Sequence, residues 1–266
     1  MNETTTAGTA RAGLPCWYEL GTTDLDGAAR FYETVLDWQV QESGVEGFDY
    51  RIASSGGGNG VAGLMALGEQ EGNPPPNWIF YVEVEDCDAA GEAVTAGGGK
   101  LLKEPADIPG TGRFAVCADP QGAVFGILHP LPMENPPTTR AFEPERAGHG
   151  CWHELTASDP SAAMDFYAKV LGWNAGESMD MGDDGPYQLA DIAGQRAVGI
   201  MNLLGMPAPA WLPYFNVVDI DATAARVTGE GGTVHHGPTE VPGGGYVIIA
   251  TDPQGARFGA SGPKSA

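Results

Sequence analysis

The chain contains two copies of one sequence pattern, and this repeat constrains the fold more than any other feature. CWYELGTTDLDGAARFYETVLDW begins at Cys16, and CWHELTASDPSAAMDFYAKVLGW begins at Cys151. Later segments recur as well, because GRFAVCADPQGAVFG from Gly112 matches GYVIIATDPQGARFG from Gly245. A period this long indicates duplicated domains rather than a solenoid.

The repeat sets the domain boundaries. We expect one domain over residues 14–130 and a second over 148–262. Residues 131–147 are rich in proline and charge, which predicts a linker. Residues 1–13 are expected to form a disordered tail.

The local signals within each copy predict two βαβββ modules. An alternating strand over 17–22 is followed by Asp24, which can cap a helix with one apolar face, and Asp159 holds the same place in the second copy. A second strand–helix unit follows, and each copy closes with Asp-Pro-Gln-Gly, a hairpin signal, at 119–122 and 252–255. The chain therefore has four such modules.

Composition excludes several classes of protein. With 35 acidic and 13 basic residues the formal net charge is −22, which opposes binding to nucleic acid or to anionic lipid. No run approaches the roughly 20 apolar residues of a membrane span, and the first residues lack a signal-peptide pattern. We expect a cytoplasmic protein whose four cysteines are small buried hydrophobic residues.

The helix pattern FY-x-x-V-L-x-W and the hairpin DPQGA-x-F-G occur in both copies. They resemble the vicinal oxygen chelate superfamily, which includes glyoxalase I, bleomycin-resistance and fosfomycin-resistance proteins, and extradiol dioxygenases. The resemblance implies an α+β fold of two tandem domains. In each domain, two βαβββ modules form a curled mixed eight-stranded sheet, a cup with the helices outside and a ligand inside.

The resemblance also implies where a metal would bind, because metal-dependent members carry ligands on four central strands. These ligand positions fall here on Trp17 and Trp152, Ile79 and Leu212, Gly126 and Gly259, and on residues 63–65 and 199–201. None of them offers the imidazole or carboxylate that a transition metal requires. We therefore expect no metal and no other cofactor.

Two carboxylates are the candidate catalytic groups. Glu19 and Glu154 share the strand parity of the inward tryptophans, so each is expected to enter a cup as a general base. Tyr81 and Tyr214 are the candidate proton donors, although these aromatic side chains could equally fill the cup as core. Glu83 is also inward, and with Glu19 it could hold a hard cation weakly.

Further inward residues are candidate ligand contacts, and the two copies differ in them. Asn216 replaces Glu83, and Arg257 replaces Val124. We therefore expect the second cup to prefer anionic or carbonyl oxygens and the first to prefer neutral or cationic compounds. Arg257 could instead form an ion pair with Glu154. The full set of candidate ligand contacts is Trp17, Met65, Glu83, Trp152, Met201, Asn216 and Arg257.

The histidines give weaker signals. His153 follows Trp152 and should point away from the cup, in a structural role. His235 and His236 are adjacent and face opposite sides of a strand, so they cannot bind one metal together and are expected to be exposed. His129 and His149 flank the linker and are expected to be solvated, or to lie at a domain interface.

Three functions remain, in decreasing order of support. The first is a metal-independent protein that binds a hydrophobic, partly aromatic compound, such as an antibiotic or a secondary-metabolite pathway intermediate. The second is a metal-independent lyase, isomerase or oxygenase accessory enzyme that uses Glu154 or Glu19 as base. The third is metal-dependent glyoxalase or dioxygenase chemistry. The sequence leaves the ligand and the oligomeric state open.

Overall fold

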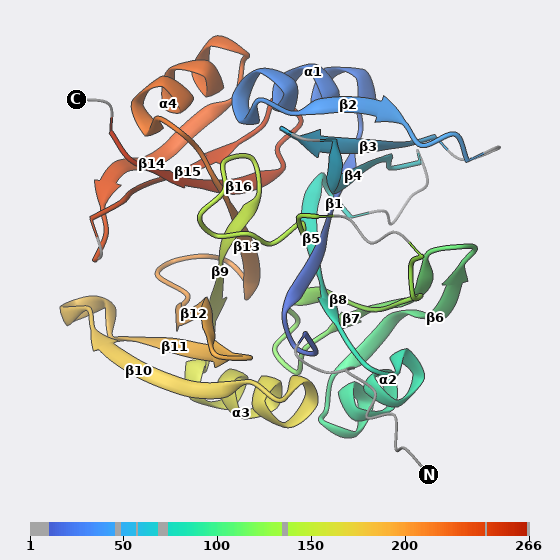
Figure 1. Ribbon diagram of the computed structural model, residues 1–266. Coiled ribbons are helices and arrows are strands. Elements are labelled where there is room, and N and C mark those ends of the chain that lie inside the picture. The colour runs from blue at the N-terminus through green and yellow to red at the C-terminus, as the bar shows by residue number, and fades with distance from the viewer. Residues whose placement is uncertain are drawn as a thin grey trace. The chain divides into compact units, whose positions relative to one another are not determined.

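Each repeat forms one mixed eight-stranded sheet (Figure 1). The computed structural model describes residues 11–45, 49–56, 58–68, 74–134, 138–242 and 244–264. The strands run in the order β2-β3-β4-β1-β5-β8-β7-β6 in the first repeat and β10-β11-β12-β9-β13-β16-β15-β14 in the second. The fold class predicted from the sequence is confirmed.

The elements of the two repeats correspond one to one. The first repeat contains β1 (Pro15–Thr22), α1 (Leu25–Leu36), β2 (Gln39–Glu42), β3 (Tyr50–Ser55), β4 (Asn59–Ala66), β5 (Asn77–Glu83), α2 (Cys87–Ala96), β6 (Lys100–Ile108), β7 (Gly112–Ala118) and β8 (Val124–Pro130). The second contains β9 (Gly150–Ala157), α3 (Pro160–Leu171), β10 (Asn174–Asp180), a short 3-10 turn η1 (Gly182–Asp184), β11 (Pro186–Ile192), β12 (Gln195–Asn202), β13 (Ala210–Asn216), α4 (Ile220–Gly229), β14 (Thr233–Glu240), β15 (Tyr246–Thr251) and β16 (Arg257–Gly262).

Local chemistry sets the helix ends as the sequence predicts. The Asp24 carboxylate accepts the backbone N–H of Gly27 at 2.9 Å, and Asp159 accepts that of Ala162 at 3.0 Å. These bonds satisfy donors that the first turn of a helix leaves without a partner. Gly172 ends α3 in the left-handed region, with φ of 71°.

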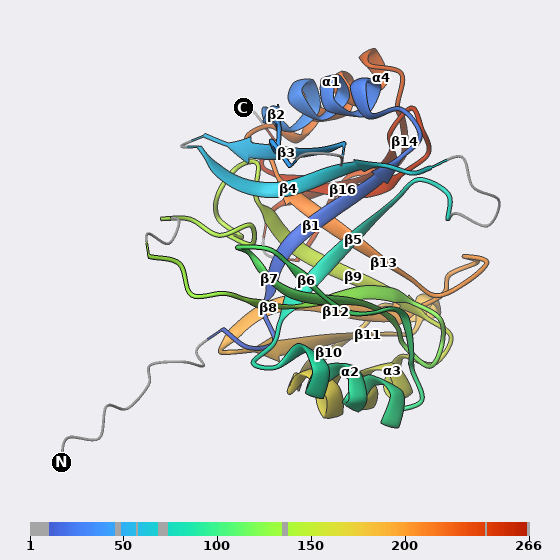
Figure 2. The same ribbon diagram turned by 90° about the vertical axis from the view of Figure 1, so that its right-hand side faces the viewer.

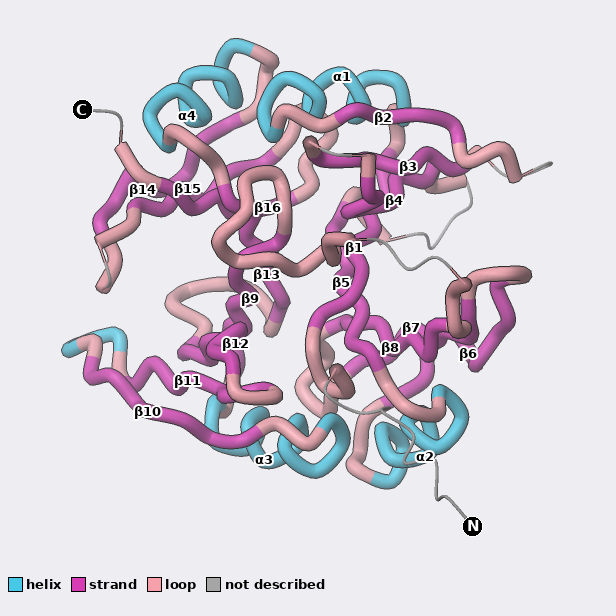
Figure 3. Tube along the Cα trace, in the orientation of Figure 1, coloured by secondary structure: helices cyan, strands magenta, loops and turns pink. Residues whose placement is uncertain are grey.

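Packing divides the chain differently from the sheets. One compact unit contains residues 81–134 and 155–211 with the segment before Trp17, and the other contains 17–80, 135–154 and 212–266. Each unit therefore combines one module from each repeat. Helix α2 packs beside α3 in the first unit, and α1 packs beside α4 in the second (Figures 2 and 3). That residues 14–130 and 148–262 form two separate domains stays a prediction.

The repeated motifs join the modules within each unit. The Tyr32 hydroxyl accepts a hydrogen bond from the Trp78 indole at 2.8 Å and donates one to Asp252 at 3.1 Å. In the other unit Trp211, Tyr167 and Asp119 form the same chain, again at 2.8 and 3.1 Å. The helix tyrosine of one repeat is therefore bonded to the hairpin aspartate of the other.

The tryptophans that follow α1 and α3 make a second matched set of contacts. Trp38 donates its indole N–H to the carbonyl of Gly148 at 2.7 Å, and Trp173 donates to the carbonyl of Gly13 at 2.8 Å. Gly13 and Gly148 both have positive φ, at 89° and 76°, a conformation that glycine adopts without steric cost. Each tryptophan thus fixes the segment that enters the first strand of the other repeat.

The predicted tail and linker are only partly described. Residues 1–10 and 135–137 lie outside the described residues. Within the rest of the linker, Ala141 and Phe142 are buried, and Phe142 pairs with Gly150. The end of the linker is therefore packed against its own unit.

Candidate functional site

The first strand of each repeat carries two half-buried site residues on one face. Trp17 and Glu19 lie on β1, where the alternate residues Tyr18 and Leu20 are fully buried. Trp152 and Glu154 occupy the same places on β9, between buried neighbours. Because successive strand side chains point to opposite faces, the tryptophan and the glutamate share a face in both repeats.

In the second repeat the structure brings together the predicted base and the predicted donor. The Tyr214 hydroxyl on β13 donates a hydrogen bond to Oε1 of Glu154 at 3.3 Å. Tyr214 is 3% exposed and belongs to an apolar cluster with Cys151 and Leu212, against which Trp152 packs. The result is a carboxylate with a phenol donor and an aromatic wall.

In the first repeat the donor to the glutamate is a residue that the sequence analysis missed. The Trp17 indole donates to the Tyr50 hydroxyl at 3.1 Å, and this hydroxyl donates to Oε2 of Glu19 at 3.2 Å. Burial raises the pKa of Tyr50, and the charge of Glu19 raises it further, so the phenol remains a neutral donor. A tyrosine in the third strand of both repeats, Tyr50 and Tyr187, was the available signal.

Tyrosine rings lie across Gly126 and Gly259, where the family resemblance places metal ligands, and across the first residue of each of the ranges 63–65 and 199–201. A Cβ atom built on Gly63 would overlap the Tyr50 hydroxyl, and one built on Gly126 would overlap the Tyr81 ring. Gly199 and Gly259 stand in the same relation to Tyr187 and Tyr214. At each of these four glycines the space of a side chain is filled by a tyrosine side chain.

The remaining ligand positions fit a metal no better. Trp17 and Trp152 lie on the first strands, and Ile79 and Leu212 lie on the fifth strand of each repeat. Among the described residues, no three His, Cys, Asp or Glu side chains are grouped so that they could hold a metal ion. This donor set does not fit the transition metal that the family implies, and we derive no chemical step through one.

The other predicted contacts lie at several places. Tyr81 is buried on β5, with its ring 6.2 Å from that of Phe114, and Glu83 is half-buried two residues further on. Asn216 is half-buried and donates to the carbonyl of Pro144 in the linker at 2.8 Å. The Asn216 amide, at the end of β13, therefore binds the linker.

The methionines and the arginine are all half-buried. Met65 lies opposite Tyr50 across β4 and β3, whereas Met201 lies near the end of β12. Arg257 begins β16 opposite Thr251. Its roles as ligand contact or as ion-pair partner of Glu154 both stay predictions.

The histidines have structural surroundings. His153 is fully buried, accepts or donates a hydrogen bond with the Tyr18 hydroxyl at 2.9 Å, and stacks on that ring. The prediction that His149 is solvated was wrong, because this residue is 1% exposed and its Nδ1 lies on the carbonyl of Arg140. The expectation of exposed side chains at His235 and His236 is confirmed.

Three of the four cysteines are buried as expected. Cys87, Cys117 and Cys151 are buried, and Cys16 is half-buried with its thiol on the carbonyl of Tyr81 at 3.4 Å. Burial raises the pKa of all four thiols, to about 11 at Cys87 and about 12 at Cys117. Such thiols are poor nucleophiles.

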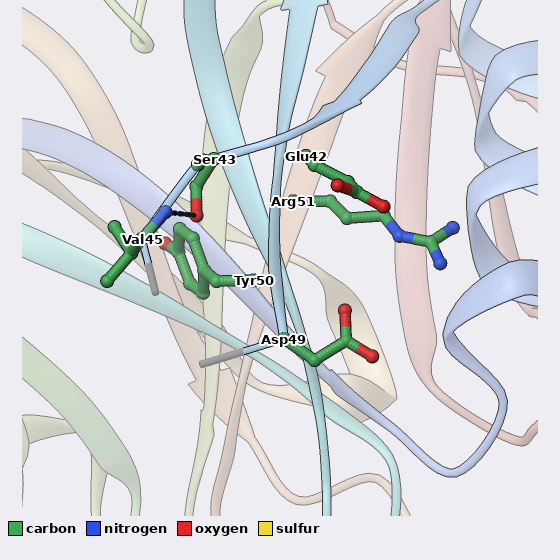
Figure 4. A pocket seen from close by; sticks show the side chains of 7 residues that line it. Glu42, Ser43, Val45, Asp49, Tyr50 and Arg51 are labelled. Carbon is green, nitrogen blue, oxygen red and sulfur yellow. Dashed lines mark hydrogen bonds between the residues drawn. The ribbon is translucent and has the colours of Figure 1, made fainter. Parts of the chain in front are cut away.

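A cavity of about 390 Å³ lies at the end of β2 and the start of β3. Figure 4 shows the Tyr50 ring beside Ser43 and Val45, and Glu42 beside Arg51. Asp49 completes the polar lining. Tyr50, which lines this cavity, is also the middle residue of the hydrogen-bonded series from Trp17 to Glu19.

Fold and site together define a tandem protein of paired βαβββ modules, with a carboxylate, a phenol and an indole on its central strands. The chain belongs to the Glyoxalase/Bleomycin resistance protein/Dioxygenase superfamily, whose sequence profile matches residues 16–127 and 151–259. The predicted family is confirmed. Members of this superfamily bind small molecules.

Two relatives match over nearly the whole chain. A protein named "Putative glyoxylase CFP32" from Mycobacterium tuberculosis (strain CDC 1551 / Oshkosh) is 33% identical over 259 residues, which are 95% of this chain and 96% of the relative. The "Anthracycline biosynthesis protein DnrV" of Streptomyces peucetius is 31% identical over 264 residues, with 92% of each chain covered.

Solved structures share the fold at lower identity. The Mn(II)-bound glyoxalase from Novosphingobium aromaticivorans has a TM-score of 0.64 and 18% identity, with 96% of this chain and 83% of that chain covered. The 2,3-dioxygenase LapB from Pseudomonas sp. KL28 has a TM-score of 0.63 and 15% identity, with 97% and 94% covered. These likenesses show the fold alone.

In the described part of this chain, no helix is long and apolar enough to cross a membrane.

Proposed function

We propose that the protein binds a hydrophobic, partly aromatic small molecule without a metal ion, in the second repeat beside Glu154 and Tyr214. The compound class is an antibiotic or an intermediate of secondary metabolism. The observation that carries the proposal is the hydrogen bond from the Tyr214 hydroxyl to Glu154, next to the half-buried Trp152.

The chemistry of this group suits such a ligand. Trp152 offers an indole face for stacking, and Tyr214 and Glu154 offer a donor and an acceptor that fix the orientation of ligand oxygens. Small-molecule sites commonly combine an apolar wall with a few polar groups in this way. The relative named for anthracycline biosynthesis supports a polycyclic aromatic compound as the first test ligand.

Metal-independence is part of the proposal. Gly259 leaves room for the Tyr214 ring at the position where a metal-dependent member carries a ligand side chain. A metal-dependent glyoxalase or dioxygenase activity has the least support, because the site presents no donor set for the ion. We also propose a cytoplasmic location, and a small molecule rather than nucleic acid as the partner.

The same pair supports a second candidate function, a metal-independent lyase, isomerase or oxygenase accessory enzyme. A carboxylate in hydrogen-bond contact with a phenol is a base next to a proton donor, the two groups that proton transfer on a carbonyl compound requires. Glu19 with Tyr50 repeats the arrangement in the first repeat, although Tyr81 was the donor predicted there.

Titration calorimetry with doxorubicin, an anthracycline, tests the proposal on the full chain after dialysis against a chelator. Preliminary thermal-shift screening would add aldehydes and thiol conjugates, since a ligand at a hundred times its Kd stabilises the native state by about 2.7 kcal/mol. Glu154→Gln and Tyr214→Phe should each weaken binding by roughly tenfold or more, the effect of losing a hydrogen bond to a charged group. Glu177→Gln, an exposed carboxylate on β10, is the matched control.

The outcomes separate the candidates. Equal affinity in folded Glu154→Gln, Tyr214→Phe and Glu177→Gln proteins would remove the pair from the site. Binding that disappears on chelation and returns with manganese or zinc would overturn metal-independence. Turnover of an aldehyde or ketone that Glu154→Gln abolishes would favour the enzyme.

A further inference from the structure

The inference concerns one face of the strands β6, β7 and β8 in the first repeat. Helix α2 packs on the other face of these strands, where Ala115 and Cys117 of β7 are fully buried. Phe114, Val116 and Ala118 alternate with these two residues along β7. Because successive strand residues point to opposite faces, these three lie on the face away from α2, which we call the Phe114 face.

Two lysines of the edge strand β6 lie on the Phe114 face. Lys100 pairs with Ala118, and Lys103 pairs with Val116, across β6 and β7. Directly opposed residues of neighbouring strands point to the same face of a sheet. Both lysines are exposed, whereas Phe114 and Val116 are half-buried. The face therefore combines an apolar surface with two cations at its edge.

A β-bulge decides that Lys103 points to this face. Leu101 pairs with the buried Cys117, so its side chain lies on the α2 side. Strict alternation would give Lys103 the face of Leu101, two residues earlier. The pairing instead shifts register between these two residues, because Lys103 lies opposite Val116. A bulge of one extra residue moves the following side chain to the opposite face.

Lys103 lies close to a pair of aromatic rings. Its Nζ atom lies over the Phe114 ring, 5.4 Å from the ring centroid. The Phe114 ring meets the Tyr81 ring edge to face, with 6.2 Å between the centroids, and Tyr81 itself is buried. An ammonium group is attracted to the face of an aromatic ring. Lys103 is therefore held beside apolar surface while its charge stays in contact with solvent.

The charge of this face is opposite to that of the whole chain. The formal net charge is −22, and only four residues of the sequence are lysine, of which Lys100 and Lys103 are two. Among the described residues, no carboxylate forms an ion pair with either of them. Two carboxylates lie further along the strands: Glu83, two strands from Phe114, and Glu104, in a second bulge of β6.

Cations beside an aromatic surface complement an aromatic anion. We propose that the Phe114 face binds an aromatic carboxylate, with the ligand ring against Phe114 and Val116 and the carboxylate on Lys100 and Lys103. The ammonium groups donate charge-assisted hydrogen bonds, and the rings pack together. This charge preference is the opposite of the one that Glu83 predicts for the first repeat. The inference goes beyond the proposed function, because it concerns the other repeat and another class of compound.

The site is tested with cinnamate, an aromatic carboxylate, and with its neutral amide, cinnamamide. Ligand-observed NMR titrations on the full chain use about 0.15 M salt, where the Debye length of about 8 Å limits repulsion by the net charge. Cinnamate should bind roughly fivefold more tightly than cinnamamide, the gain expected from exposed ion pairs. Lys100→Met/Lys103→Met keeps the apolar stems, so it should abolish this preference and leave cinnamamide affinity unchanged.

A matched double variant separates local recognition from general attraction. Lys169→Met/Lys264→Met removes the other two lysines, which are both exposed, and changes the net charge by the same amount. This variant should keep the full preference for cinnamate. Phe114→Leu keeps an apolar side chain and removes the ring, so both compounds should bind several-fold more weakly. Circular dichroism checks the fold of each variant.

The result that overturns the inference is equal affinity for cinnamate and cinnamamide, or an equal loss of preference in the two lysine double variants. Unchanged binding in folded Phe114→Leu protein would also overturn it. Failure here is distinguishable from failure of the proposed function. If cinnamate shows no preference while Glu154→Gln still weakens doxorubicin binding, only the Phe114 face is wrong. Lys100→Met/Lys103→Met should leave doxorubicin affinity unchanged, and a loss would contradict a separate site.

Discussion

Replacing Tyr32 by phenylalanine tests whether the repeated motifs of this chain act in packing rather than in ligand binding. Tyr32 is fully buried, and its hydroxyl stands between the Trp78 indole N–H and the Asp252 carboxylate. Asp252 uses its other oxygen to accept the backbone N–H groups of Gln254 and Ala256 in the hairpin. The substitution keeps the ring and deletes only the bridge between the two repeats.

The expected cost follows from the groups left behind. A buried N–H without its partner costs about 1–3 kcal/mol, and a hydrogen bond to a charged group contributes about 1.5–3 kcal/mol. Burial raises the pKa of Asp252, and the hydrogen bond from Tyr32 opposes this rise by stabilising the charged carboxylate. We expect a net destabilisation of about 2–4 kcal/mol, which in a chain of this size lowers Tm by roughly 5–15 °C.

Urea denaturation followed by tryptophan fluorescence and circular dichroism measures the effect. Tyr167→Phe, the same change in the other unit, should cost a similar amount, because its bonds to Trp211 and Asp119 have the same lengths. Tyr246→Phe, at a half-buried tyrosine beside Lys264, is the control and should cost under about 0.5 kcal/mol.

A double-mutant cycle sharpens the test. Tyr32→Phe combined with Asp252→Asn should show a coupling of about 1 kcal/mol or more, since the two groups share one hydrogen bond. The reasoning would be refuted if Tyr32→Phe matched the Tyr246→Phe control, or if the two changes were additive.

Three other predictions concern a histidine, the four cysteines and a glycine. Burial lowers the pKa of His149 from 6.5. The unfolded chain therefore binds more protons than the folded chain below that pH. The free energy of unfolding should fall on acidification by up to about 1.4 kcal/mol per pH unit. His149→Gln should flatten this dependence in denaturation at pH 7.5 and 5.5, and an unchanged slope would contradict the assignment. Native protein should resist a thiol reagent at pH 8 while urea exposes all four cysteines; rapid labelling of Cys87 or Cys117 in native protein would show that they are not buried. Gly126→Ala should destabilise the fold by about 1–3 kcal/mol, because its Cβ would overlap the Tyr81 ring; Gly126→Ala/Tyr81→Leu should recover part of the loss, and no recovery would place the strain elsewhere.

Local sequence signals determined the elements of this protein. Asp24, Asp159 and Gly172 mark helix ends, because caps and left-handed residues act on atoms a few positions away. Alternation along one strand put Trp17 with Glu19, and the match between copies established the tandem arrangement and the family. These signals occur in both repeats, so each prediction rests on two matching segments.

Contacts between distant segments were decided by the tertiary structure. Tyr50 reaches Glu19 only because β3 pairs with β4 in one register and Gly63 leaves the space, and no periodicity in the sequence encodes that register. Tyr32 and Asp252 are 220 residues apart. The motif that contains each residue was recognisable in the sequence, but the hydrogen bond between the two residues was not. His149 lies in a polar, proline-rich neighbourhood but is buried, since burial depends on what packs against a segment. The sequence thus determined fold and family, whereas side-chain partnership depended on register and packing, which are long-range properties.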